Sequence, residues 1–186
     1  MAEKKARRGS LVIAIGGLHG TGKSTHARRL ARALGLRYVS AGLLFRRLAE
    51  ERGVSLEELS RSAEEDPDID RLIDGMTREE ARRGGVVIDG ALSAWMAEEA
   101  DIKILLTSPL EARIERIAAR DGLTIEEARR RTLFREEMER GRFKKLYGID
   151  VLDTSIYDIV INTELFDAEG TARILKKIVH EYCSKR

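Results

Sequence analysis

Short apolar runs alternate with longer stretches of helical periodicity along the chain. Residues 11–15 form a continuous apolar run rich in branched side chains, as expected for a central strand of a parallel sheet. Apolar side chains then recur at helical spacing through residues 23–34, and Gly35 provides a stop. A second short strand is predicted at residues 37–40.

The same alternation continues to the end of the chain. Residues 43–83 have helical periodicity, with a capping box that begins at Ser55 and a second helical piece that begins at Asp66. Further strands are predicted at residues 86–89, 102–106 and 157–161, and further helices at 109–120 and 168–182. Strands separated by helices indicate an α/β fold with a parallel sheet covered on both faces.

The composition fits one soluble domain with balanced charge. The 186 residues predict a single domain at 11–186, preceded by a basic tail at 1–10. Lys and Arg number 34 against 32 Asp and Glu, so the net charge of +2 argues against a general nucleic-acid binder. No apolar run is long enough to span a membrane, and the N-terminal residues lack the apolar stretch of a signal peptide.

The rare residue types add hints about the cellular setting. The single cysteine, Cys183, has no intrachain disulfide partner, which favours a reducing compartment. Glutamine is absent and Asn162 is the one asparagine, a pattern typical of thermophiles when Glu and Arg are abundant. We expect a cytoplasmic monomer with no membrane or nucleic-acid partner.

Residues 17–24 satisfy the pattern G-x-x-x-x-G-K-[ST] between a predicted strand and a predicted helix. Glycines let successive backbone N–H groups point at one phosphate, and the helix adds its positive end. Lys23 can reach the β- and γ-phosphates, while the Ser24 hydroxyl suits Mg²⁺. The sequence therefore predicts an ATP and Mg²⁺ site formed by Gly17, Leu18, His19, Gly20, Thr21, Gly22, Lys23, Ser24 and Thr25.

Asp89 ends a predicted strand at the same edge of the sheet as this loop. We interpret it as the carboxylate that holds magnesium-bound water, and a helix cap or turn role before Gly90 is the alternative. For His19 the backbone N–H matters more than the ring, so no imidazole chemistry is assigned to it.

An arginine-rich stretch lies between Gly122 and Gly148. Phosphoryl transfer between two anionic groups needs several cations, and the planar fork of arginine grips phosphate oxygens in pairs. Arg135 and Arg142, seven residues apart, fall on one face of a helix. Residues 121–150 therefore predict a mobile lid that excludes water, whereas a solvated charged helix is the alternative.

Other classes of P-loop protein fit less well. GTPases read guanine through Asn-Lys-x-Asp, but Asn162 is followed by Thr163 and Glu164. Motors and large ATPases need a longer chain. The length favours a small-molecule kinase.

Several segments resemble nucleoside monophosphate kinases. Besides the phosphate loop, these are residues 39–46 and 87–90. The segments 135–137, 147–150 and 155–163, together with Arg142, are similar to the archaeal type of cytidylate kinase, and the match runs over residues 11–163.

This resemblance implies a P-loop NTPase fold with a five-stranded parallel sheet, a helical monophosphate-binding region at about 40–85, and the arginine-rich lid. It implies ATP as donor and CMP, together with dCMP, as acceptor. The implied catalytic residues are Lys23, Arg135 and Arg142; the acceptor-binding residues are Ser40, Arg46, Asp89 and Glu139; and the metal-binding residues are Ser24 and Asp89.

Two positions depart from the family pattern. Across the wider kinase group a hydroxyl residue often stands where this chain has Ala41, and the second departure is Ala91. An arginine commonly follows the glycine of the Asp-Gly pair and contacts the acceptor phosphate, but this chain has Ala91. The acceptor clamp is therefore either compensated elsewhere or altered. The alternatives are a kinase for AMP, UMP or a small metabolite, and a P-loop assembly factor whose lid arginines contact RNA or protein.

Overall fold

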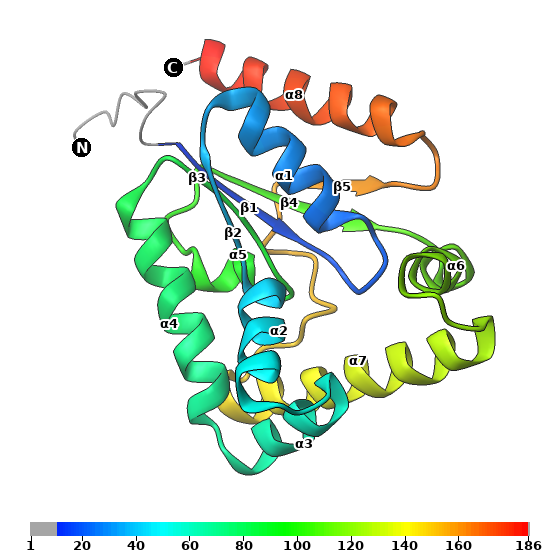
Figure 1. The fold of residues 1–186 in the computed structure, drawn as a ribbon. Coiled ribbons are helices and arrows are strands. Elements are labelled where there is room, and N and C mark those ends of the chain that lie inside the picture. Colours follow the sequence, from blue (N-terminus) through cyan, green and yellow to red (C-terminus); the bar gives the residue numbers. More distant parts are fainter. Residues whose placement is uncertain (1–10, 186) are drawn as a thin grey trace.

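A five-stranded parallel sheet forms the centre of the computed structural model, which describes residues 11–185 (Figure 1). Its strands are β1 (Val12–Gly16), β2 (Arg37–Ser40), β3 (Val86–Asp89), β4 (Ile102–Thr107) and β5 (Ile159–Asn162). The order across the sheet is β2-β3-β1-β4-β5, and every neighbouring pair is parallel. The predicted α/β fold is therefore confirmed, while the predicted basic tail lies outside the described residues.

Helices connect and cover the strands. They are α1 (Lys23–Leu34), α2 (Ala41–Arg52), α3 (Leu56–Glu65), α4 (Asp68–Arg83), α5 (Ser93–Met96), α6 (Leu110–Asp121), α7 (Ile125–Tyr147) and α8 (Ala168–Ser184). The short α5 was not predicted, because four residues are too few to show a helical period. The last strand begins two residues later than predicted. Tyr157 instead packs against Gly16, where an added Cβ would lie 2.0 Å from the phenol oxygen.

Both faces of the sheet are covered, which explains why the central strands are apolar throughout. On one face, Ile13 and Ile104 belong to a core with Leu30 of α1 and Leu175 of α8. On the other face, α4 and α5 pack against β1 and β3, with Ala81 and Ala94 in that core. The carboxyl ends of the strands are thereby fixed as one rigid edge.

The predicted acceptor region folds as helices α2, α3 and α4, which have a core of their own. Phe45, Leu59 and Ile73 are buried together in it. The capping box at Ser55 forms as predicted, since its hydroxyl and the Glu58 carboxylate each accept a backbone N–H of the other residue.

Helix α7 is the element that the sequence predicted as a lid. It runs for 23 residues across the molecule beside α3, and it follows α6 (Figure 1). Glycines with positive φ flank it, Gly122 at 65° and Gly148 at 69°. Movement of α7 stays a prediction. Within residues 11–185, no helix is long and apolar enough to cross a membrane.

Alanine substitutions at two glycines should change the stability in opposite directions. One acts through backbone strain in the phosphate loop, and the other acts through helix propensity. Gly17 has φ +144°, and an added Cβ would lie 2.4 Å from the Leu106 carbonyl oxygen. Gly17→Ala should destabilise the fold by about 1–3 kcal/mol. Gly75, inside α4, has nothing within 4 Å of an added Cβ. Gly75→Ala should therefore stabilise the fold by about 0.5–1 kcal/mol. Thermal unfolding measures the stability of both variants, and equal melting temperatures for the two variants would contradict this description.

Candidate active site

The loop after β1 wraps around a space that is suited to a phosphate. Gly20 and Gly22 have φ of +81° and +84°, and an added Cβ at Gly20 would lie 2.6 Å from the Arg113 carbonyl oxygen. Glycine is therefore required for both conformation and space. Lys23 folds back over the loop and donates its ammonium to the Leu18 carbonyl at 3.1 Å. Burial lowers the pKa of Lys23, although Asp89 acts in the opposite direction.

Ser24 and Asp89 meet at the end of the sheet. The Ser24 hydroxyl donates to Asp89 Oδ2 at 2.6 Å. The other carboxylate oxygen, Asp89 Oδ1, is buried without a hydrogen-bond partner among the described residues. A hydroxyl beside an unsatisfied carboxylate oxygen is a donor set that fits Mg²⁺. These two residues would hold the ion as predicted.

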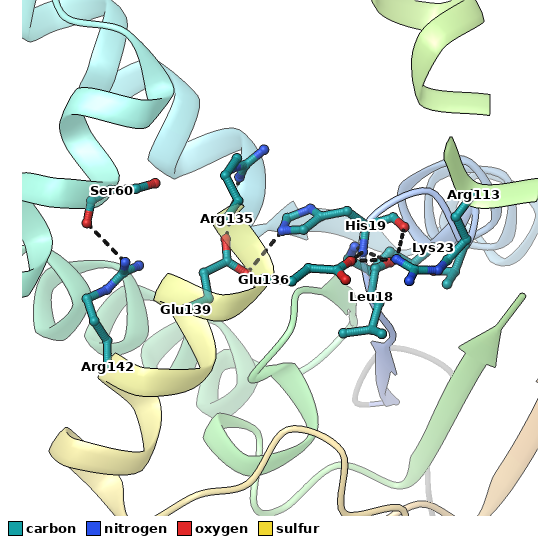
Figure 2. A network of polar contacts seen from close by, with 10 residues as sticks. Leu18, His19, Lys23, Ser60, Arg113, Arg135, Glu136, Glu139 and Arg142 are labelled. Atoms are coloured by element: carbon teal, nitrogen blue, oxygen red, sulfur yellow. Dashed lines mark hydrogen bonds and ion pairs between the residues drawn. The ribbon is translucent and has the colours of Figure 1, made fainter. Parts of the chain in front are cut away.

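Helix α7 reaches the phosphate loop through Glu136 (Figure 2). Its Oε1 accepts the His19 backbone N–H at 3.1 Å and an Arg113 N–H at 2.5 Å. Arg113 also donates to the His19 carbonyl at 2.9 Å and is 5% exposed. Sequence reasoning gave no role to Arg113 or to Glu136, although Glu136 belongs to a segment that carries the resemblance. Each looks like one charge among many on an exposed helix.

Glu139, one turn further along α7, lies between His19 and Arg135. It contacts the His19 ring at 3.1 Å and Arg135 at 3.5 Å. Burial alone would raise the pKa of Glu139, but the His19 and Arg135 charges hold it at about 2. The ring of His19, to which the sequence assigned no role, thus helps to join α7 to the loop. Arg135 Nε is buried without a hydrogen-bond partner among the described residues, as a group awaiting an anion would be.

A cavity of about 400 Å³ lies between the loop, α4 and α7. It brings together most of the predicted site residues, namely Gly17, Leu18, His19, Gly20, Gly22, Lys23, Ser24, Thr25, Arg46, Asp89, Arg135, Glu139 and Arg142. Thr21 does not line this cavity, since its buried hydroxyl donates to the Leu18 carbonyl. Ser40 does not line it either. Its hydroxyl accepts the Leu43 N–H at 3.3 Å and caps α2, and its contact with the acceptor stays a prediction.

Arg142 is engaged differently from the prediction. Its Nε donates to Asp70 Oδ2 at 2.8 Å, and its Nη1 donates to the Ser60 carbonyl at 3.1 Å. Figure 2 shows the guanidinium pointing toward Ser60, away from the phosphate loop. Arg142 nevertheless lines the cavity, and its role toward the transferring phosphoryl group or the acceptor phosphate stays a prediction.

Two arginines of α6 that the sequence analysis passed over also line the cavity, Arg116 and Arg120. Burial, followed by the positive charges of Arg120 and Arg135, lowers the pKa of Arg46. Neighbouring arginine side chains repel one another when no anion lies between them. Such a cluster indicates a binding site for an anion. Arg116 and Arg120 each have a carboxylate partner as well, Glu164 and Asp121 respectively.

Comparison with known proteins agrees with this geometry. Residues 13–141 match a family described as AAA domain. The cytidylate kinase of Ignicoccus hospitalis is 52% identical over 169 residues, covering 90% of this chain and 98% of that protein. The cytidylate kinase of Staphylothermus marinus is 49% identical over 173 residues, covering 92% and 98%. The chain belongs to the cytidylate kinase family.

The comparison with solved structures supports the fold of the chain and nothing beyond the fold. The shikimate kinase of Bacteroides thetaiotaomicron has a TM-score of 0.61 at 16% identity, covering 91% of this chain and 98% of that one. The shikimate kinase of Acinetobacter baumannii, in complex with shikimate, has a TM-score of 0.59 at 18% identity, covering 92% and 94%. The fold of this cytidylate kinase family member is thus similar to that of other small kinases.

Two buried carboxylates on α4 complete the cavity of this cytidylate kinase family member. Asp70 pairs with Arg142, while Asp74 Oδ2 accepts the Tyr147 hydroxyl at 2.8 Å. Burial raises the pKa of Asp74 to about 6, and the negative charge of Asp70 adds to that effect. Both groups were missed by sequence analysis, because they fall on a helix whose face could not be assigned.

The raised pKa of Asp74 predicts a stability that depends on pH. The ordinary pKa of aspartate, expected in the unfolded chain, is 3.8, so the folded chain binds the Asp74 proton more tightly than the unfolded chain does. The ionised carboxylate therefore costs about 3 kcal/mol above pH 6, and the cost disappears below about pH 4. Asp74→Asn should be stabilised relative to the wild type by a margin that grows as the pH rises through this window. Denaturant unfolding at several pH values measures the margin, and a constant value would contradict the assignment.

Proposed function

We propose that this protein transfers the γ-phosphoryl group of ATP to CMP, and also to dCMP, giving ADP and the nucleoside diphosphate. The observation that carries the proposal is the cavity in which the Gly17–Ser24 loop faces Arg46 and Arg135. The polar groups of this cavity are suited to two anionic substrates, a phosphate donor and a phosphate acceptor, rather than to one. The similarity to curated cytidylate kinases supports cytidine monophosphate as the acceptor.

The reaction needs positioning more than proton transfer. An acceptor phosphate oxygen is already anionic and attacks the γ-phosphorus in line, so no strong general base is required. Lys23 would leave the Leu18 carbonyl for the β- and γ-phosphates, and Arg135 would neutralise the transferring group. Mg²⁺ bound at Ser24 and Asp89 would supply further positive charge to the phosphates.

The alternatives give different products. A kinase for AMP, UMP or a small metabolite would use the same donor site with another acceptor. A nucleotide-binding assembly factor would bind ATP without acceptor-dependent ADP release, and salt-sensitive RNA binding would accompany it.

An acceptor panel tests the proposal. ADP release from Mg·ATP is measured with CMP, dCMP, UMP, AMP, GMP and no acceptor, at elevated temperature. We expect turnover with CMP and dCMP well above the other acceptors. Turnover with another acceptor alone, or with none, would overturn the assignment of CMP and leave the donor site in place.

Lys23→Ala should lower the turnover number by about 10²–10³-fold or more, because its charge serves the transferring phosphoryl group. The fold should survive, since Lys23 donates only one hydrogen bond among the described residues, to Leu18. Lys177→Ala on α8 is the matched control, because that side chain is 70% exposed and far from the cavity. A Lys23→Ala protein with full activity would refute the mechanism.

A further inference from the structure

A charged pair outside the phosphate loop binds both sides of one residue of that loop. Arg113 of α6 and Glu136 of α7 form an ion pair at 2.5 Å, and their side chains are only 6% and 14% exposed. Arg113 Nη1 also donates to the His19 carbonyl at 2.9 Å, while Glu136 Oε1 accepts the His19 N–H at 3.1 Å (Figure 2). The N–H and the carbonyl of His19 are therefore bound by the two members of one pair.

Helix α6 lies directly against the loop at this point. A Cβ added to Gly20 would lie 2.6 Å from the Arg113 carbonyl oxygen and 2.8 Å from the Arg113 Cβ. Arg113 is thus held at its backbone as well as at its guanidinium group. It does not line the catalytic cavity, whereas Glu136 does. Both observations indicate that Arg113 acts on its neighbours in the protein and not on a bound phosphate.

A carboxylate in this place needs a compensating charge, because the phosphates of ATP are anionic. Burial lowers the pKa of Lys23, and Glu136 is one of the nearby carboxylates that act in the opposite direction. An unpaired Glu136 would therefore repel the phosphates that Lys23 is proposed to bind. Arg113 neutralises that charge, so the pair as a whole adds no net charge beside the loop.

Glu136 also determines where Arg135 lies, since the two residues are adjacent on α7. Arg135 lines the cavity, and its Nε is buried without a hydrogen-bond partner among residues 11–185. The contact of Glu136 with the His19 N–H holds this turn of α7 against the loop. The contact of Glu139 with the His19 ring depends on the same loop residue. The position of Arg135 thus depends on how His19 is held.

We propose that Arg113 and Glu136 are positioning residues for phosphoryl transfer. Glu136 holds α7 against the phosphate loop so that Arg135 faces the transferring group, and Arg113 neutralises Glu136 so that this contact does not weaken ATP binding. The inference rests on the proposed function, because it takes Arg135 as the side chain that acts on the phosphoryl group. The two members of the pair therefore have different effects. Loss of Glu136 lowers the rate of transfer, whereas loss of Arg113 lowers the affinity for ATP.

Glu136→Ala separates positioning from binding. We expect kcat with ATP and CMP to fall by about 10- to 100-fold, because Arg135 is misplaced. The Kd of Mg·ATP, measured by isothermal titration calorimetry without acceptor, should not rise. In an Arg135→Ala background the same substitution should lower kcat no further, since no arginine is left to position. Glu137→Ala is the matched control on the same turn, because Glu137 is exposed and outside the cavity, and it should change neither quantity.

Arg113→Met keeps most of the side-chain length and removes the charge. We expect the Kd of Mg·ATP to rise by about 10- to 100-fold, because an unpaired carboxylate then faces the phosphates. The double variant Arg113→Met/Glu136→Ala should bind Mg·ATP more tightly than Arg113→Met, although it carries one substitution more. If the pair served packing alone, the double variant would be the weaker binder.

Two outcomes overturn this inference. One is a loss of kcat on Glu136→Ala that is equally large with and without Arg135. The other is a double variant that binds Mg·ATP no better than Arg113→Met. The binding measurements contain no acceptor, so they test the role of Arg113 even if CMP is not the substrate. A wild type that binds Mg·ATP but does not phosphorylate CMP refutes the proposed function instead.

Discussion

The electrostatic contact between the phosphate loop and α7 is the interaction on which the arrangement of the site depends. Glu136 accepts both the His19 N–H and an Arg113 N–H, so one carboxylate joins the loop, α6 and α7. Glu139 adds a contact to the His19 ring. An N–H that would otherwise point at a phosphate thus has an anionic partner before any nucleotide binds. A bound polyphosphate has to compete with that carboxylate or share its donors.

The same contacts fix where the acceptor can lie. Arg135 projects from the turn of α7 that faces the loop, and Arg142 lies two turns away against Asp70. Arg135 therefore lies on the part of α7 that contacts the phosphate loop, whereas Arg142 lies on the part that contacts α4. On the proposed function, a nucleoside monophosphate in this cavity would have its phosphate near Arg46 and Arg135. Closure around both substrates would exclude the water that hydrolyses ATP.

The sequence predicted the features that depend on local pattern. The four predicted strands besides the last agree with the structure to within a residue at each end, and α1 spans the predicted residues. The phosphate loop and its carboxylate partner Asp89 were predictable because parallel strands bring their carboxyl ends to one edge. The placement of Arg46, Arg135 and Glu139 around one cavity also follows the resemblance, although their roles stay predictions.

What the sequence could not supply are pairings between residues far apart in the chain. Arg142 and Asp70 are 72 positions apart, and His19 and Glu136 are 117 apart. The sequence does not show whether an arginine in a charged helix faces solvent or is buried. Arg142 is buried, with an exposed fraction of 5%. For Ser40 the sequence likewise did not show the helix cap, because a serine at a strand end can contact a ligand or cap the next helix. Tertiary packing decides each of these cases.

The central claim is that donor and acceptor phosphates meet in the one cavity between the phosphate loop and α7. A bisubstrate compound with adenosine and cytidine joined through five phosphates tests it most directly, by steady-state inhibition against each substrate in turn. The account predicts competition with both ATP and CMP, together with binding tighter than that of either nucleotide alone. Competition with ATP but not with CMP would contradict the account, because the acceptor would then bind outside this cavity.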